Sequence, residues 1–140
     1  MKQLAIILGL AAAWQISNAE LGGAPAPAND QSQLQTFQNY KVLSHSFNDD
    51  SQYKEYLDGS NLVFAVFWDG TSRPDMSKLL GKYFFEFQSL NANAPHLNGA
   101  TQLESSNLVI QSQGRMRSFS GLAYLPTRLP VNFSPSEIGR

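Results

Sequence analysis

The sequence predicts an α+β domain in which a small antiparallel β-sheet packs on one face against a single helix. Short runs rich in aromatic and β-branched residues stand between turn-forming clusters, which is typical of strands. One segment, residues 76–90, repeats its apolar residues at spacings of three and four, which is typical of a helix. The predicted order is therefore β-β-β-α-β-β, and short turns make neighbouring strands antiparallel.

The first three strands are expected before the helix. The first begins near residue 36 and ends at the turn cluster 48–51, and residues 52–57 form the second strand of a hairpin. The third strand, residues 62–68, is an unbroken apolar run. Alternation would leave one face in water, whereas an unbroken run indicates burial on both faces. This segment is the predicted central strand.

The helix start carries a capping pattern. Ser72 is expected to accept from backbone amides of the first turn, with Asp75 three residues later, and Pro74 in that turn sacrifices no needed donor. Gly81 lies inside the apolar pattern, where a glycine costs about 1 kcal/mol relative to alanine. We expect it to mark a close approach of the helix to the sheet.

The last two strands are expected at residues 107–111 and 115–125. Gln113 and Gly114 supply the turn between them, because glycine adopts turn conformations readily. Two prolines end the longer strand, and Ser134 is expected to cap a single helical turn near the C-terminus.

The first 19 residues have the three-part pattern of a signal peptide. A lysine follows Met1, residues 4–14 are apolar and uncharged, and small residues precede the predicted cleavage site at Glu20. The apolar core is shorter than the ~20 residues that cross a bilayer. We therefore expect an exported protein, periplasmic or secreted, with no membrane span after cleavage.

One folded domain is expected after the leader. Residues 20–35 contain two adjacent glycines, Pro25 and Pro27, and several glutamines, a composition typical of a flexible linker. The remaining residues, 36–140, are long enough for a single α+β domain. No internal repeat marks another domain, and the sequence leaves the oligomeric state open.

The composition argues against several classes of function. A formal net charge of -1 does not favour a nucleic-acid partner. With no cysteine, the chain has no thiol catalysis, no disulfide and no thiolate metal site. His45 and His96 lack the tight spacing of a metal site, and Asp49 and Asp50 lack the alternating oxygen ligands of a calcium loop. We expect no metal ion and no cofactor.

Hydrolytic chemistry has little support in the sequence. His45 and His96 lie beside no nucleophile signature, and we expect both to be partly exposed and without a catalytic role. Asp69 and Asp75 flank the turn before the helix and could serve as an acid/base pair. Each also has a structural role available, Asp69 as a turn acceptor and Asp75 in the first helical turn. No residue is predicted to be catalytic.

The strongest candidate for binding is the set Arg115, Arg117 and Phe119. On one strand face, two guanidinium groups at positions i and i+2 stand about 7 Å apart. Such a pair can hold a carboxylate, a phosphate or an acidic partner. Alternatively, the arginines pair across the sheet with Glu55 or Asp58, or simply face solvent.

Several segments of the chain resemble one bacterial family. They read EYLDGSNLVFAVFWDG, RPDMSKLLGKYF, SQGRMRSFSGLAYLP and LPVNFSPSEI, together with LGG directly after the leader. They are similar to the exported, uncharacterised family catalogued as domain of unknown function 2844, and the resemblance covers essentially the whole chain after the leader. It implies a proteobacterial, exported protein and brings no reaction, substrate or catalytic residue.

Two classes of function follow. We favour a non-catalytic exported binding or accessory protein that meets a protein partner in the cell envelope through its sheet face or edges, since edge strands present unpaired backbone groups. The alternative is a small periplasmic hydrolase that uses Asp69 and Asp75. An inhibitor-like role is a third idea that rests on architecture alone.

Overall fold

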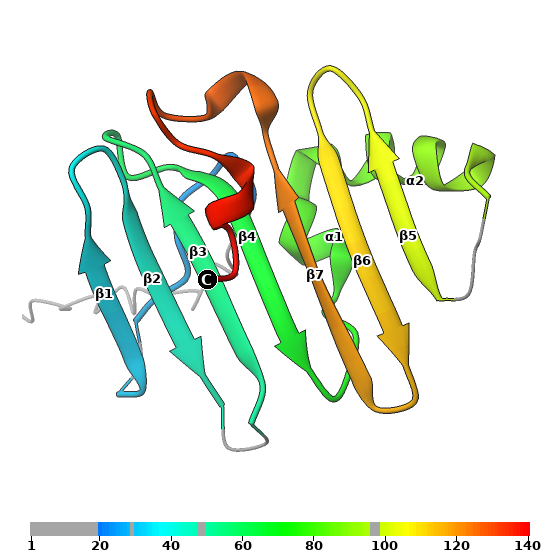
Figure 1. Ribbon diagram of the computed structural model, residues 1–140, viewed down its shortest axis with the longest axis horizontal. Coiled ribbons are helices and arrows are strands. Elements are labelled where there is room, and N and C mark those ends of the chain that lie inside the picture. Colours follow the sequence, from blue (N-terminus) through cyan, green and yellow to red (C-terminus); the bar gives the residue numbers. More distant parts are fainter. Residues whose placement is uncertain (1–19, 29, 48–49, 96–98) are drawn as a thin grey trace, which may run out of the picture.

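One antiparallel sheet dominates the computed structural model, which describes residues 20–28, 30–47, 50–95 and 99–140. Its seven strands lie in the order β1-β2-β3-β4-β7-β6-β5 (Figure 1). They are β1 (Ser32–Thr36), β2 (Lys41–Ser46), β3 (Gln52–Leu57), β4 (Val63–Gly70), β5 (Ala100–Glu104), β6 (Val109–Arg115) and β7 (Ser118–Tyr124). The helical segments are α1 (Met76–Leu80), η1 (Gly81–Tyr83), α2 (Phe84–Asn93), η2 (Pro126–Arg128) and η3 (Pro135–Glu137). The predicted α+β class is confirmed.

Two strands were missing from the predicted order of five. β1 lies where a linker was expected, and β5 lies in the segment expected to be a loop after the helix. Both are edge strands whose side chains are mostly exposed, with sequences SQLQT and ATQLE. An edge strand has little apolar surface to bury, so the period of two that signals a strand is absent from its sequence. The central position of β4 agrees with its apolar run.

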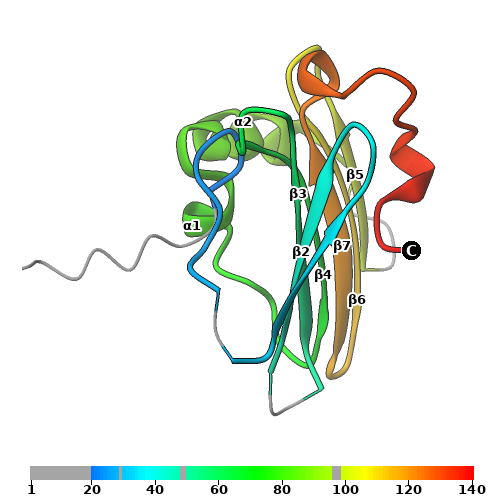
Figure 2. The same cartoon turned by 90° about the vertical axis from the view of Figure 1, so that its left-hand side faces the viewer.

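The N-terminal segment packs onto the domain, which differs from the expected flexible linker over residues 20–35. Leu21 is fully buried, and its N–H donates to the carbonyl of Leu79 at 2.9 Å. The Gly22 N–H donates to the carbonyl of Val63 at 2.7 Å, and the Val63 N–H donates to the carbonyl of Gly23 at 2.9 Å. Figure 2 shows this segment on the same side of the sheet as α1 and α2. The predicted signal peptide, residues 1–19, lies outside the described residues.

The helix starts later than predicted and breaks at Gly81. Asp75, and not Ser72, is the N-cap of α1 and accepts from the Ser77 N–H at 3.1 Å. Gly81 has a φ of +51°, and a Cβ there would overlap the side chain of Glu20. The close approach at this glycine is therefore to the N-terminal segment and not to the sheet. None of the helices formed by the described residues is long and apolar enough to cross a membrane.

Both faces of the sheet are covered, so the prediction of packing on one face is corrected. The helix-side core gathers apolar residues of the N-terminal segment, the helices and the sheet, among them Leu21, Val66, Trp68, Leu80 and Ile110. On the opposite side, the C-terminal segment crosses β3 and β4 (Figures 1 and 2). This tail-side core contains Val42, Tyr56, Phe64, Ala65, Phe133 and Ile138. Ser134 accepts from the Ser136 N–H and caps η3, as expected.

Candidate binding site

The β6–β7 hairpin turns at Met116 and Arg117, three residues beyond the turn predicted at Gln113 and Gly114. Arg115 pairs with Ser118, and Arg117 has a φ of +59°. Gly114 instead lies within β6, directly opposite Phe119, and a Cβ there would come within 2.6 Å of the Phe119 ring. This glycine gives room to an aromatic ring on the neighbouring strand, a requirement that the local sequence does not show.

The hairpin separates the three predicted binding residues. Because side chains alternate along a strand, Arg115 lies on the side of the sheet opposite to the buried Ile110 of β6. Arg117 stands in the turn, and Phe119 lies on the helix side in β7. The expectation that these residues share one strand face is therefore wrong. All three still lie at one end of the sheet, and whether they bind a partner stays a prediction.

Phe119 has a cationic neighbour that the sequence did not suggest. The Cζ atom of Arg73, in the loop between β4 and α1, lies 5.5 Å from the centroid of the Phe119 ring, a cation–π arrangement. Gly70 of β4 pairs with Phe119 from the other side. The available signal was that Arg73 comes shortly after the central strand β4, whose end lies beside the start of its antiparallel neighbour β7.

A pocket of about 170 Å³ opens beside this contact. Its lining includes apolar Trp68 and Phe87 together with polar Thr101 and Ser112, and it reaches Arg73 and Phe119. The indole of Trp68 lies over Gly121, where a Cβ would overlap the ring. Two glycines of neighbouring strands, Gly114 and Gly121, therefore allow two of the aromatic rings that line this pocket to lie close to the sheet.

The arginines at this end of the sheet have no acidic partner in the part of the chain that the structure describes. Arg73, Arg115 and Arg117 are all exposed, and the ion pair that the structure shows lies elsewhere, between His45 and Glu55. The predicted alternative of pairing with Glu55 or Asp58 is wrong. Asp58 instead accepts from the N–H groups of Ser60 and Leu62 in its own turn.

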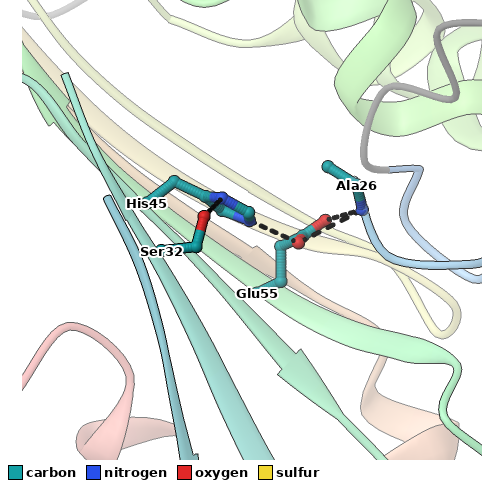
Figure 3. A network of polar contacts seen from close by, with 4 residues as sticks. All are labelled: Ala26, Ser32, His45 and Glu55. Carbon is teal, nitrogen blue, oxygen red and sulfur yellow. Dashed lines mark hydrogen bonds and ion pairs between the residues drawn. The ribbon is translucent and has the colours of Figure 1, made fainter. Parts of the chain in front are cut away.

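Glu55 and His45 form a buried network on the helix side of β2 and β3 (Figure 3). His45 is only 4% exposed and Glu55 is fully buried, with 2.9 Å between His45 Nε2 and Glu55 Oε2. The Ala26 N–H donates to both carboxylate oxygens, at 2.9 and 3.3 Å. Ser32 Oγ lies 2.8 Å from His45 Nδ1. These contacts tie the N-terminal segment, β1, β2 and β3 together.

This network corrects the expectation that His45 is partly exposed, whereas His96 lies outside the described residues. A serine, a histidine and a glutamate do lie in one hydrogen-bonded series. Both ring nitrogens of His45 are engaged, however, and a buried, fully partnered charge is typical of a structural role. Beside it, the Tyr53 hydroxyl is buried and has no hydrogen-bond partner among the described residues. Its burial, and secondly the charge of Glu55, raise the pKa of Tyr53 well above the usual value.

Of the two acids in the hydrolase alternative, Asp75 has a structural role and Asp69 is exposed to solvent. Asp75 accepts from the Ser77 N–H and, at 2.6 Å, from the Ser77 hydroxyl, and this side-chain hydrogen bond lowers the pKa of Asp75. Asp69 is exposed in β4 opposite Ser120. Asp50 stands in a turn with a φ of +64°, whereas Asp49 lies outside the described residues. Among the residues that the structure describes, no three acidic or histidine side chains gather as metal ligands would.

Comparison with protein families matches residues 17–138 to the family described as protein of unknown function (DUF2844). The chain belongs to this family. No curated protein and no solved structure matches it. The DUF2844 match spans the pocket, the hairpin and the buried network alike, and it carries no reaction or ligand to any of them.

Proposed function

We propose that this DUF2844 protein is a non-catalytic, exported binding protein that holds an acidic segment of a protein partner in the cell envelope. The site is the end of the sheet that carries Arg73, Arg115, Arg117 and Phe119, which we call the arginine end. The observation that carries the proposal is the guanidinium of Arg73. It lies over Phe119, lines the pocket with this ring, and has no ion-pair partner among the described residues.

The chemistry of Arg73 suits a carboxylate. A guanidinium above an aromatic ring can still donate hydrogen bonds from the N–H groups in its own plane. A carboxylate accepts two such hydrogen bonds at once. The ring beneath it is flanked by Gly70 and Gly114 on the two neighbouring strands. Since Arg73 already rests on this ring, it has less side-chain freedom to lose when a partner binds.

The pocket adds selectivity to the charge. Small-molecule sites usually enclose about 300–1,000 Å³, whereas this pocket holds about 170 Å³, enough for a side chain of a larger partner. Trp68 and Phe87 would contact the apolar part of the bound side chain, and the hydroxyls of Thr101 and Ser112 offer it hydrogen bonds. We therefore expect an acidic residue beside an apolar one in the bound segment.

The hydrolase alternative has less support from the same contacts. A carboxyl whose pKa is lowered, as in Asp75, stays ionised and makes a poor general acid. The described histidine, His45, has both ring nitrogens engaged in the buried network. Export is supported by the leader pattern of residues 1–19.

A titration of the full ¹⁵N-labelled chain with a tetraglutamate peptide tests the binding site. We expect chemical-shift changes at Gly70, Gly114 and Phe119, and we expect them to shrink with added salt because exposed charges are screened. Arg73→Ala should weaken binding about tenfold, the effect of losing one charge-assisted hydrogen bond.

Arg128→Ala is the matched control for this titration. Arg128 is an exposed arginine of η2, outside the arginine end, so its removal changes the net charge equally. Arg115→Ala and Arg117→Ala measure whether the two predicted arginines contribute. Equal weakening by Arg73→Ala and Arg128→Ala, or no shifts at Phe119, would show that the arginine end is not a binding site.

A further inference from the structure

The strand β1 is the outermost strand of the sheet, and no described strand pairs with its outer side. Figure 1 shows it at the end of the strand order, and Figure 2 looks onto this edge. Its last four residues are exposed, and Leu34 exposes 58% of its surface. Proteins usually protect such edges with charged residues, prolines or bulges, but the sequence SQLQT has no charge and no proline. An exposed edge strand of this composition can pair with another strand.

The sequence of β1 is complementary to itself. If two copies pair antiparallel about a two-fold axis at Leu34, each Leu34 faces the Leu34 of the other copy, and each Gln33 faces a Gln35. Leu34 pairs with Leu43 of β2 and so lies on the helix side, while Gln33 and Gln35 point to the opposite side. The pairing would thus place apolar side chains together on one face and amides together on the other, both of which stabilise cross-strand pairs.

The strand at the opposite edge, β5, is not complementary to itself in this way. β5 ends at the acidic Glu104. An antiparallel pairing of two β5 strands about Gln102 would place Glu104 against Ala100 and Leu103 against Thr101. A two-fold contact repeats the same patch on both copies, so β1 is the edge suited to it.

We propose that two copies of this chain join through β1 into one continuous antiparallel sheet with a two-fold axis at Leu34. The proposal does not rest on the proposed function, because the arginine end lies at the β6–β7 hairpin and away from β1. It also makes no use of the side chains of the buried network.

The absence of cysteine allows a direct test by crosslinking. In the full chain, Leu34→Cys introduces a single thiol, and on the axis its Cα would lie about 4.5–5.5 Å from that of its symmetry mate. This separation suits a disulfide. We expect mild oxidation to convert Leu34→Cys into a covalent dimer, and Met116→Cys, at a position 96% exposed on the far hairpin, to stay mostly monomeric. Equal crosslinking of the two variants would overturn the proposal.

A pair of double variants tests the register itself. Because each Gln33 would face a Gln35, Gln33→Lys with Gln35→Lys sets like charges opposite each other, whereas Gln33→Lys with Gln35→Glu sets opposite charges together. Sedimentation should show a dimer for the wild type, an affinity about tenfold weaker for the double lysine variant, and a restored dimer for the lysine–glutamate variant. Circular dichroism checks that both variants stay folded. A monomeric wild type, including one whose β1 binds a different protein, contradicts the proposal.

Discussion

Two regions of this protein treat their charged side chains in opposite ways. In the buried network, His45 and Glu55 are out of water and every polar atom of the carboxylate has a partner. At the arginine end, Arg73, Arg115 and Arg117 are exposed, and the described residues offer them no carboxylate. Buried polar groups must be satisfied within the fold, whereas exposed ones need not be. The difference separates side chains that hold the domain together from side chains available to a partner.

The largest expected effect is at the buried network. His45→Ala leaves the Glu55 carboxylate buried without its imidazole partner, which should cost about 3–5 kcal/mol of the free energy of unfolding. Urea denaturation of the full chain measures the loss. Glu55→Gln keeps the size of the side chain and an acceptor for the Ala26 N–H, and should cost less. A loss below about 1 kcal/mol for His45→Ala would show that the network is not structural.

The next effect concerns Gly121, which lies under the Trp68 ring that lines the pocket. In Gly121→Ala the new Cβ would overlap the indole of Trp68 and lie 2.8 Å from the carbonyl oxygen of Gln111. Such overpacking should cost about 1–3 kcal/mol in denaturation. Gly59→Ala is the matched control, because a Cβ at Gly59 would meet no atom of the described residues within 4 Å. If both substitutions have the same effect, the close approach of Trp68 to the sheet is not what requires Gly121.

A smaller effect, in the opposite direction, is expected at Tyr53. Its buried hydroxyl has no partner in the part of the chain that the structure describes, so Tyr53→Phe should leave stability unchanged or raise it by up to about 1 kcal/mol. Because the pKa of Tyr53 is raised in the folded state, the unfolded chain releases this proton at a lower pH than the folded chain. The contribution of Tyr53 ionisation to stability is therefore fully present below pH 10.0, the usual pKa of tyrosine, and is lost as the pH rises further. Thermal unfolding above pH 10.0 should therefore depend less on pH in Tyr53→Phe. An unchanged alkaline slope would contradict this.

The smallest expected effect on stability is at the arginine end. Arg73→Ala removes an exposed cation–π contact and no ion pair with a described residue, so the free energy of unfolding should change by about 0.5 kcal/mol. Denaturation measured beside the peptide titration separates the two properties. If Arg73→Ala lost as much stability as His45→Ala, the contrast between the arginine end and the buried network would be wrong.

The sequence predicted what local patterns determine. The unbroken apolar run marked the central strand β4, and the apolar spacing of three and four marked the helical segment. It missed β1 and β5, whose short polar sequences form strands because a neighbouring strand offers hydrogen bonds. Gly114 was misread as a turn residue because the side chain that requires a glycine there, the ring of Phe119, is on another strand.

Local patterns also did not predict the contacts of the buried network and of the arginine end. His45 lies between two serines, and its burial depends on Glu55 of the neighbouring strand and on the N-terminal segment. Phe119 was identified as a candidate, but Arg73, which contacts it, comes from the loop before the helix. Contacts between distant segments decided both cases, and no spacing rule within one segment contains them.

Site-specific photo-crosslinking in the cell envelope tests the central claim most directly. The full chain, expressed in a bacterium with an outer membrane, carries a photoreactive phenylalanine analogue at Met116 beside the arginine end, or at Val131, which is 78% exposed in the C-terminal segment. We predict a discrete protein adduct from position 116, none from position 131, and loss of that adduct when Arg73→Ala is added. The same adducts from both positions, or an adduct that survives Arg73→Ala, would contradict binding at the arginine end.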